Sequence, residues 1–170
     1  LVCCADGSYR KKISPDVSGA GWVIQCSRTG NFIEGCFYEV SDSANAYRAE
    51  QLVVDALHQL LAAISIFYGR KDWKSRAGCD SLGTIKITRR RLKRIRPSMK
   101  CADILRNIRT LRNKMTTRPD YFHVLGHMDE FLAEEYLTLE QLLNKRCDIL
   151  AKSAIDTWLR NMRAGIIRTK

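Results

Sequence analysis

No apolar run in the sequence approaches the roughly 20 residues that a membrane-spanning helix needs, and no charged-then-apolar leader opens it. The sequence also lacks internal repeats, low-complexity tracts and stretches with the composition of a domain linker. These absences argue against a membrane protein, a repeat protein and a chain of several domains. The 170 residues, 45% hydrophobic and 28% charged, have the size and composition of one globular domain.

We expect a single domain over residues 1–170, with a core of about 1–160 and a basic C-terminal tail over 160–170. The chain begins at Leu1, without a methionine, and enters a strand pattern at once. We therefore expect it to be part of a longer polyprotein.

Cysteine spacing gives no support for a metal centre built from thiolates. The seven cysteines are odd in number and show no metal-ligand spacing, and most of them fall within apolar strand or helix patterns. This usage is typical of buried, reduced thiols, and we expect a cytoplasmic or nuclear protein.

Acidic residues are outnumbered by basic ones. The chain has 18 Asp and Glu against 29 Lys and Arg, which gives a net charge of +11 and a pI of about 9.6. This excess favours a polyanionic partner, because neutralising phosphates releases counterions. A basic surface that only keeps the protein soluble is the alternative that charge alone leaves open.

Short apolar runs bounded by turn residues predict strands, and apolar residues at three- and four-residue steps predict helices. The predicted strands are 1–6, 21–27, 32–40, 75–80 and 121–126, and the predicted helices are 44–67, 81–96, 101–115 and 139–162. We interpret the DGS at the end of the first strand as a turn, 14–19 as a loop and Gly30-Asn31 as the turn of an antiparallel hairpin. Ser43 is the expected start of the first helix. This order predicts an α/β fold in which helices cover one mixed sheet.

Four acids occupy unusual places in this pattern. Asp6 and Asp80 end strands, Glu50 lies in the second turn of the first long helix beside its apolar face, and Asp148 lies within the last helix. Converging carboxylates repel one another unless a divalent cation neutralises them, and Mg²⁺ prefers oxygen ligands. Two such ions about 4 Å apart activate water in phosphodiester hydrolysis. A single Asp at a strand end is more often a turn or cap residue, and spacing alone leaves both interpretations open.

Six segments, in this order, resemble type 1 ribonuclease H, especially the domain carried by retroelement reverse transcriptases. They are ADGSYR (5–10), GAGWVIQ (19–25), YRAEQL (47–52), CDSLG (79–83), FHVLGH (122–127) and NKRCDILAKSA (144–154). The resemblance runs from about residue 3 to 156. It implies a ribonuclease H-like α/β fold with a five-stranded mixed sheet, an antiparallel hairpin plus parallel strands, flanked by helices.

The resemblance also implies an activity, which is hydrolysis of the RNA strand of an RNA–DNA hybrid by an endonuclease using two Mg²⁺ ions, with Mn²⁺ as a possible substitute. A reverse transcriptase region would be covalently linked upstream. Asp6, Glu50, Asp80 and Asp148 would be catalytic metal ligands, and His127 would help protons to move and product to leave. The residues expected to bind nucleic acid are Ser8, Arg10, Lys86, Arg89, Arg90, Arg91, Lys93, Arg94 and Asn144. Six of these lie in the acid-free basic run 86–100, whose alternative is a solvated charged face.

The sequence departs from the family pattern between the histidine and the last aspartate, where twenty residues separate His127 from Asp148. Thr138 and Gln141 fit a capping box, so 139–143 extend the last helix backward and leave 128–136 (MDEFLAEEY) as an insertion. This departure keeps open a second function, a catalytically inactive ribonuclease H-like module that only binds nucleic acid. A proofreading-type exonuclease is disfavoured, because Ser8 stands where that family has an acid.

Two other histidines receive structural interpretations. His58 is expected on the surface of the first helix, and His123, which alternates with apolar residues on a strand, is expected to be partly buried.

Overall fold

The structure, a computed structural model, describes residues 1–69, 73–90 and 94–167. Its strands are β1 (Val2–Tyr9), β2 (Val17–Gln25), β3 (Phe32–Val40), β4 (Arg76–Cys79) and β5 (Asp120–His123). Its α-helices are α1 (Ala46–Tyr68), α2 (Leu82–Arg89), α3 (Ala102–Lys114) and α4 (Leu139–Arg163). Two 3₁₀ helices, η1 (Met128–Glu130) and η2 (Glu134–Tyr136), precede α4.

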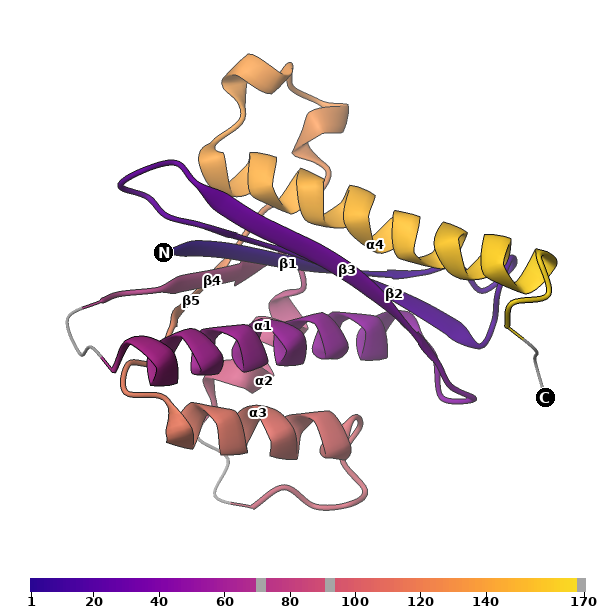
Figure 1. Ribbon diagram of the computed structural model, residues 1–170, viewed down its shortest axis with the longest axis horizontal. Coiled ribbons are helices and arrows are strands. Elements are labelled where there is room, and N and C mark those ends of the chain that lie inside the picture. The colour runs from indigo at the N-terminus through magenta and orange to yellow at the C-terminus, as the bar shows by residue number, and fades with distance from the viewer. Residues whose placement is uncertain (70–72, 91–93, 168–170) are drawn as a thin grey trace.

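The predicted mixed sheet is confirmed. Its strand order is β3-β2-β1-β4-β5, with antiparallel pairing from β1 through β3 and parallel pairing of β1 with β4 and of β4 with β5. α4 lies against one face of the sheet, whereas α1 covers the other face and carries α3 on its outer side (Figure 1). The central strand is therefore buried on both faces, which explains why LVCCA is apolar without alternation.

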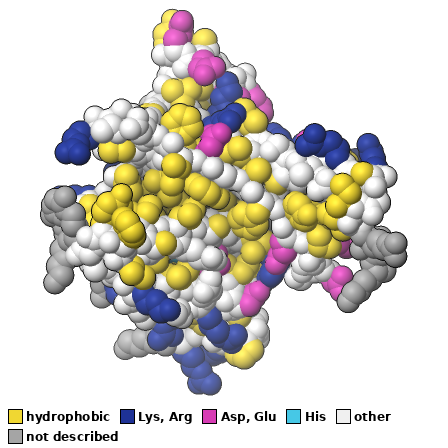
Figure 2. All heavy atoms as spheres, viewed as in Figure 1, with side chains coloured by type: hydrophobic (Ala, Val, Ile, Leu, Met, Phe, Trp, Pro, Cys, Tyr) yellow, Lys and Arg dark blue, Asp and Glu magenta, His cyan; other side chains and the backbone are white. Residues whose placement is uncertain are grey.

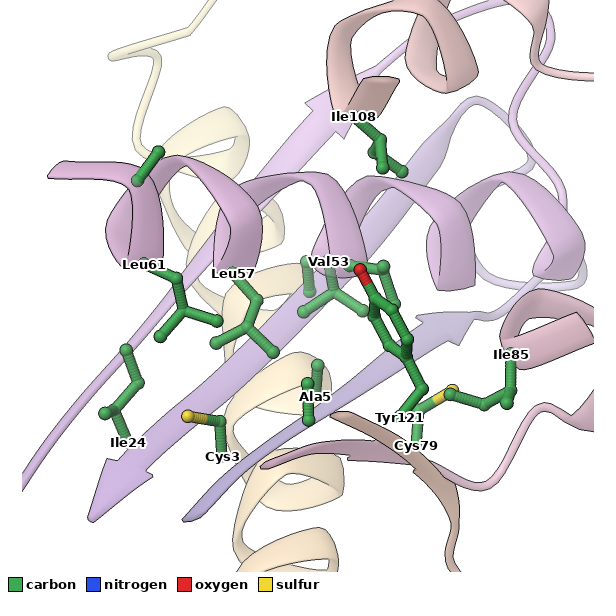
Figure 3. Close-up of a cluster of buried hydrophobic side chains, with 14 of the residues drawn as sticks. Cys3, Ala5, Ile24, Val53, Leu57, Leu61, Cys79, Ile85, Ile108 and Tyr121 are labelled. Carbon is green, nitrogen blue, oxygen red and sulfur yellow. The ribbon is translucent and has the colours of Figure 1, made fainter. Parts of the chain in front are cut away.

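The larger core cluster lies between the sheet and α1. Figure 3 shows Cys3, Ala5 and Ile24 of the sheet facing Val53 and Leu57 of α1, all of them buried. A second cluster fills the opposite face under α4, and it contains Val2 and Cys4, the neighbours of Cys3 and Ala5 that point the other way. Small and medium side chains on β1 thus let both helices come close to the sheet.

Glycines allow that close approach. A Cβ atom on Gly21 of β2 would lie 2.2 Å from the carbonyl oxygen of Cys147 in α4. A Cβ on Gly7 of β1 would lie 2.5 Å from the backbone nitrogen of Glu50 in α1. Since Asp6 pairs with Gly21 across the β1–β2 ladder, both contacts occur beside Asp6. The two helices are therefore in backbone contact with the sheet where the acids of the sequence pattern lie.

Several element boundaries differ from those predicted. The DGS segment continues β1 as far as Tyr9, because its residues stay paired with β2, which begins at Val17 inside the predicted loop. Sheet pairing here overrides the local turn preference of DGS. Helix α2 ends at Arg89, short of the predicted residue 96, and Asn45, not Ser43, caps α1 by accepting a hydrogen bond from the backbone of Arg48. The hairpin turn is confirmed, with Gly30 at φ 75°.

By length and composition, α1 is apolar enough to cross a membrane, which departs from the expectation that no segment would be. The core helix of a soluble protein passes the same test, and 50% of the stretch concerned is buried within the domain. The composition of α1 is therefore weak evidence for a membrane span.

The expectation for His58 was wrong, because this residue is fully buried between α1 and β5. Its Nδ1 lies 2.6 Å from the carbonyl oxygen of Val54, and its Nε2 lies 2.5 Å from the hydroxyl of Tyr121. A neutral ring satisfies both contacts, with Nδ1–H donating to the carbonyl and Nε2 accepting from the tyrosine. His58 therefore links α1 to β5 through a hydrogen bond with Tyr121.

Acidification should destabilise the fold through His58. Burial lowers the pKa of His58 from 6.5 to about 4, so the unfolded chain takes up the proton first as the pH falls. The stabilisation from the neutral ring is thus complete above pH 6.5 and is lost between pH 6.5 and about pH 4. We expect this group to remove about 2 kcal/mol from the free energy of unfolding between pH 7 and pH 5, measured by urea denaturation.

The variant His58→Gln isolates this effect from other titrating groups. It should be less stable than the parent protein at pH 7, yet its stability should change less between pH 7 and pH 5. His123→Gln, at an exposed histidine, should keep the full pH dependence. Equal pH dependence in the parent and His58→Gln would contradict the assignment.

Candidate active site

Three of the four predicted carboxylates meet at one edge of the sheet. Asp6 comes from β1, Glu50 from α1, and Asp80 from the residue directly after β4. One carboxylate oxygen from each lies within 4.8 Å of the others. The parallel register pairs Cys4 of β1 with Gly78 of β4, so Asp6 and Asp80 each follow two residues later, at the carboxyl end of β4, where α/β sheets assemble ligand sites. The separation is short enough for a shared cation.

Burial makes this cluster costly when all three acids are ionised. Asp6 is 5% exposed, and its pKa rises to about 7, first through burial and then through the charges of Asp80 and Asp148. The pKa of Glu50 lies well above its usual value, for which burial is the main cause and Asp6 the next. Burial also raises the pKa of Asp80. The site therefore favours protons or a cation over three bare negative charges.

The donor set fits a hard divalent cation. The Oε1 atom of Glu50 accepts a hydrogen bond from the backbone of Gly7 at 3.4 Å. Its Oε2 atom is buried and has no hydrogen-bond partner among the residues that the structure describes. A buried carboxylate oxygen without a donor is costly, and carboxylate oxygens are the ligands that Mg²⁺ and Mn²⁺ prefer. These residues are therefore suited to hold a metal ion.

Asp148 lies near this group but is not part of it. The charge of Asp148 contributes to the raised pKa of Asp6, so the two side chains lie near each other. The contact of Gly21 in β2 with Cys147 in α4 places Asp148 there. Its Oδ2 atom, however, accepts a hydrogen bond from the ammonium of Lys152 at 2.5 Å. The fourth acid of the sequence pattern is therefore engaged in an ion pair with its own helix.

The backbone of the GH segment lies directly against Asp80. A Cβ on Gly126 would lie 2.4 Å from the Oδ2 atom of Asp80, so a larger residue at this position would displace the carboxylate. His127 follows at φ 55°, is exposed, and places Nδ1 3.3 Å from Glu130. His123 is exposed instead of partly buried, and its Nε2 lies 2.8 Å from the carbonyl oxygen of Asp80. Both histidines thus lie around the Asp80 turn.

The insertion 128–136 forms η1 and η2 and protrudes beyond the N-terminal end of α4 (Figure 1). The capping box predicted from Thr138 and Gln141 is confirmed, so the helix begins where expected. Phe131 is 77% exposed and Tyr136 is 70% exposed, and Figure 2 shows acidic and hydrophobic side chains together on this lobe. The lobe starts directly at His127 and leaves the three-acid cluster intact.

Three of the expected nucleic-acid residues are not free at the surface. Ser8 is 9% exposed and Asn144 is 4% exposed, and the Oδ1 atom of Asn144 has no hydrogen-bond partner among the described residues. Arg10 forms an ion pair of 2.7 Å with Asp156 of α4. Ser8 and Asn144 are therefore buried and Arg10 is paired. Contact of these three residues with nucleic acid stays a prediction.

The basic run is divided between exposed and engaged residues. Lys86, Arg90 and Arg94 are exposed, whereas the guanidinium of Arg89 donates to the carbonyl oxygen of Tyr121 in β5. The expected contacts of Arg91 and Lys93 lie outside the described residues. Basic side chains gather at the lower edge of the molecule in Figure 2, near α3 and the segment before it.

Helix α3 also contributes to this basic surface, which was not predicted from the sequence. Arg109 and Arg112 of α3, and Arg118 from the segment after it, join Arg90 around a cavity of about 280 Å³ between α2 and α3. The three-residue spacing of the α3 arginines was the available signal, because it places them on one face of a helix. Arg112 is also held in place, since it donates to the carbonyl oxygen of Thr88 and lies over the ring of Tyr121.

Solved structures share this architecture over nearly the whole chain. The RNase H1 of the archaeon Halobacterium salinarum is 19% identical with a TM-score of 0.62, over 92% of this chain and 97% of that one. LC11-RNase H1, isolated from compost and solved with an RNA/DNA hybrid, is 20% identical with a TM-score of 0.65, over 93% and 98%. The RNase H domain of PFV is 14% identical with a TM-score of 0.64, over 90% and 92%.

The chain has a ribonuclease H-like fold. No protein-family model matches the sequence, and no curated protein sequence matches it significantly. At such low identity the likeness establishes the ribonuclease H-like fold and leaves the activity to be inferred from the side chains of this chain.

Neutralising Glu50 should stabilise the metal-free protein. Glu50→Gln keeps an oxygen to accept from the Gly7 amide and removes a buried carboxyl group whose own pKa is raised by burial and by the charges of Asp6 and Asp80. We expect the free energy of unfolding at pH 7.5, measured in EDTA, to rise by about 1–2 kcal/mol. Because the raised pKa of Glu50 makes the parent protein lose stability as the pH rises above 4.5, the usual pKa of a glutamate, this loss should be smaller in Glu50→Gln, which lacks that titrating group.

The matched control is Glu34→Gln, since Glu34 is a glutamate held by two hydrogen bonds from Arg146. That hydrogen bonding lowers the pKa of Glu34, so its neutralisation should slightly destabilise the protein. Destabilisation by Glu50→Gln in EDTA would show that the three acids are not mutually repulsive.

Proposed function

We propose that this chain is a metal-dependent ribonuclease H, an endonuclease that hydrolyses the RNA strand of RNA–DNA hybrids. The observation that carries the proposal is the convergence of Asp6, Glu50 and Asp80 within 4.8 Å at the edge of the sheet, with pKa values raised by burial. A cluster that only stabilised the fold would pair these acids with Lys or Arg, and none of the three has such a partner among the described residues.

The residues of the cluster have distinct roles in this proposal. Asp6, Glu50 and Asp80 would hold one Mg²⁺ ion, and Asp148 would contribute to a second, with Mn²⁺ able to replace both. Bound divalent cations supply activation of water and stabilisation of the leaving oxygen. His127, which is exposed and follows the glycine that contacts Asp80, would carry a proton away from the reacting groups.

The hybrid would be held through its backbone and shape. Lys86, Arg90 and Arg94 are exposed on the basic run, and α3 adds arginines beside them. Contacts of this kind position a duplex without reading its sequence. The solved complex of LC11-RNase H1 with an RNA/DNA hybrid supports this substrate class.

A reverse transcriptase is the proposed wider context. This chain aligns with 20% of the prototype foamy virus protease-reverse transcriptase, at 16% identity and a TM-score of 0.68. We accordingly propose a retroelement enzyme in which a reverse transcriptase region precedes this domain, acting in the cytoplasm or nucleus.

An inactive module that only binds nucleic acid is the second candidate. The ion pair between Asp148 and Lys152 favours it, because a catalytic site of this type uses the fourth acid. The acidic lobe at 128–136 also favours it, since negative charge beside the cluster opposes the approach of phosphates.

Cleavage of a labelled hybrid separates the two candidates. With Mg²⁺ or Mn²⁺, we expect internal cuts in the RNA strand only, and no cleavage of double-stranded DNA. Asp80→Asn should lower the rate by at least about a hundredfold, because it removes a proposed metal ligand. If the parent protein binds the hybrid but does not cleave it with either Mg²⁺ or Mn²⁺, the enzymatic function is refuted and the inactive binding module is supported.

Removing the exposed part of the basic run should weaken hybrid binding. We expect Lys86→Ala/Arg90→Ala/Arg94→Ala to lower the slope of log affinity against log salt by about one to three, because each lost phosphate contact lowers it by roughly 0.9. The loss should be the same for hybrids of different sequence, measured by fluorescence anisotropy. Alanine at Arg28, Arg160 and Arg163, which are exposed elsewhere, is the matched triple control. Equal slopes in the two triple variants would remove the basic run from the interface.

A further inference from the structure

Lys152 is a basic residue placed directly against the candidate metal site, although no motif of the sequence assigns it a role. It lies one turn after Asp148 on α4, and its ammonium is 2.5 Å from the Oδ2 atom of Asp148. The Asp148 side chain is 24% exposed and the Lys152 side chain 45%, so the pair is partly screened from water but open on one side. The interaction is therefore stronger than that of a fully exposed ion pair.

The backbone fixes this pair beside the cluster. Cβ atoms on Gly19 and Gly21 of β2 would lie 2.1 Å and 2.2 Å from the carbonyl oxygens of Ala151 and Cys147. These two α4 residues directly precede Lys152 and Asp148, so the segment of helix that carries the pair is in contact with β2. Asp6 lies opposite Gly21 in the β1–β2 ladder. The contact between Gly21 and α4 therefore also sets the position of the Asp148–Lys152 ion pair relative to Asp6.

A lysine ammonium and a divalent cation compete for the carboxylate of Asp148. Both seek its carboxylate oxygens, and two cations at one carboxylate repel each other. Asp6, Glu50 and Asp80 have no basic partner of this kind among the described residues. The four acids are therefore unequal, with three available to a metal ion and one already paired.

We infer that Lys152 is a positioning residue that competes with a divalent cation for Asp148 and makes the two cation positions unequal in affinity. The position formed by Asp6, Glu50 and Asp80 fills first, and the position that needs Asp148 fills at higher metal concentration because Lys152 must be displaced. This inference rests on the proposed metal site and concerns the order and strength of its occupation.

Mn²⁺ binding to the whole chain, measured by calorimetry and by electron paramagnetic resonance, tests the inference. In the parent protein we expect two binding steps, the second weaker. Lys152→Met should tighten the weaker step by about three- to tenfold, in proportion to the loss of one partly screened ion pair. Lys152→Arg, which keeps the charge, should behave like the parent protein.

Two further variants provide the controls. Lys145→Met removes a lysine of the same helix whose partner is Glu134 of the insertion, and it should leave both steps unchanged. Asp148→Asn should abolish the weaker step and, combined with Lys152→Met, should cancel the gain. In the cleavage assay, the Mg²⁺ concentration for half-maximal rate should fall in Lys152→Met by the same factor as the weaker step tightens.

Failure of this inference differs from failure of the proposed function. Equal or weaker Mn²⁺ binding by Lys152→Met, with normal binding by the parent protein, would overturn the role of Lys152 and leave the metal site standing. No Mn²⁺ binding by the parent protein, or the same binding by Asp80→Asn, would overturn both.

Discussion

Backbone contact between the sheet and its two covering helices is the constraint on which the rest of this structure depends. Gly7 lets α1 reach β1, and Gly19 and Gly21 let α4 reach β2, at distances that no side chain would allow. The Gly7 contact lies next to Glu50 on α1, and the Gly21 contact lies next to Asp148 on α4. The same packing that buries the core thus brings charged residues from four separate elements to one edge of the sheet.

This arrangement opposes stability locally. Asp6, Glu50 and Asp80 are close together and largely removed from water, and their raised pKa values record the cost of ionising them side by side. Apolar burial elsewhere, between α1 and the sheet, offsets that cost. Strained clusters of this kind are typical of sites that bind or react, because stability alone would not retain them.

Charge is also unevenly distributed around the site. Exposed Lys86, Arg90 and Arg94 and the arginines of α3 form one basic region, whereas the lobe at 128–136 carries four acids and no basic residue. A duplex would be attracted to the first and repelled by the second, so the two regions together restrict how a polyanion can approach the cluster. Lys152 adds a local effect, because its ammonium is paired with the carboxylate of Asp148.

The sequence alone determined the main architecture and the candidate acids. Periodicity predicted every strand and every α-helix of the structure, and motif order identified Asp6, Glu50 and Asp80, because these signals are local along the chain. The ends of β1 and β2 were wrong, since cross-strand pairing carries the ladder through DGS and into the predicted loop. The capping box at Thr138 was right, because a helix cap depends on residues three positions apart.

Tertiary structure decided what depends on neighbours distant in sequence. His58 is buried where Tyr121 of β5 contacts its ring, and the arginines of α3 join the basic region because α3 packs beside α2. Asp148 was identified from its motif, and its ion pair with Lys152 is local to α4, but the placement of both residues beside Asp6 follows from the packing of α4 on β2. Local pattern identifies the candidate residues because helix and strand signals depend on near neighbours in sequence, whereas long-range packing decides which of these residues lie together.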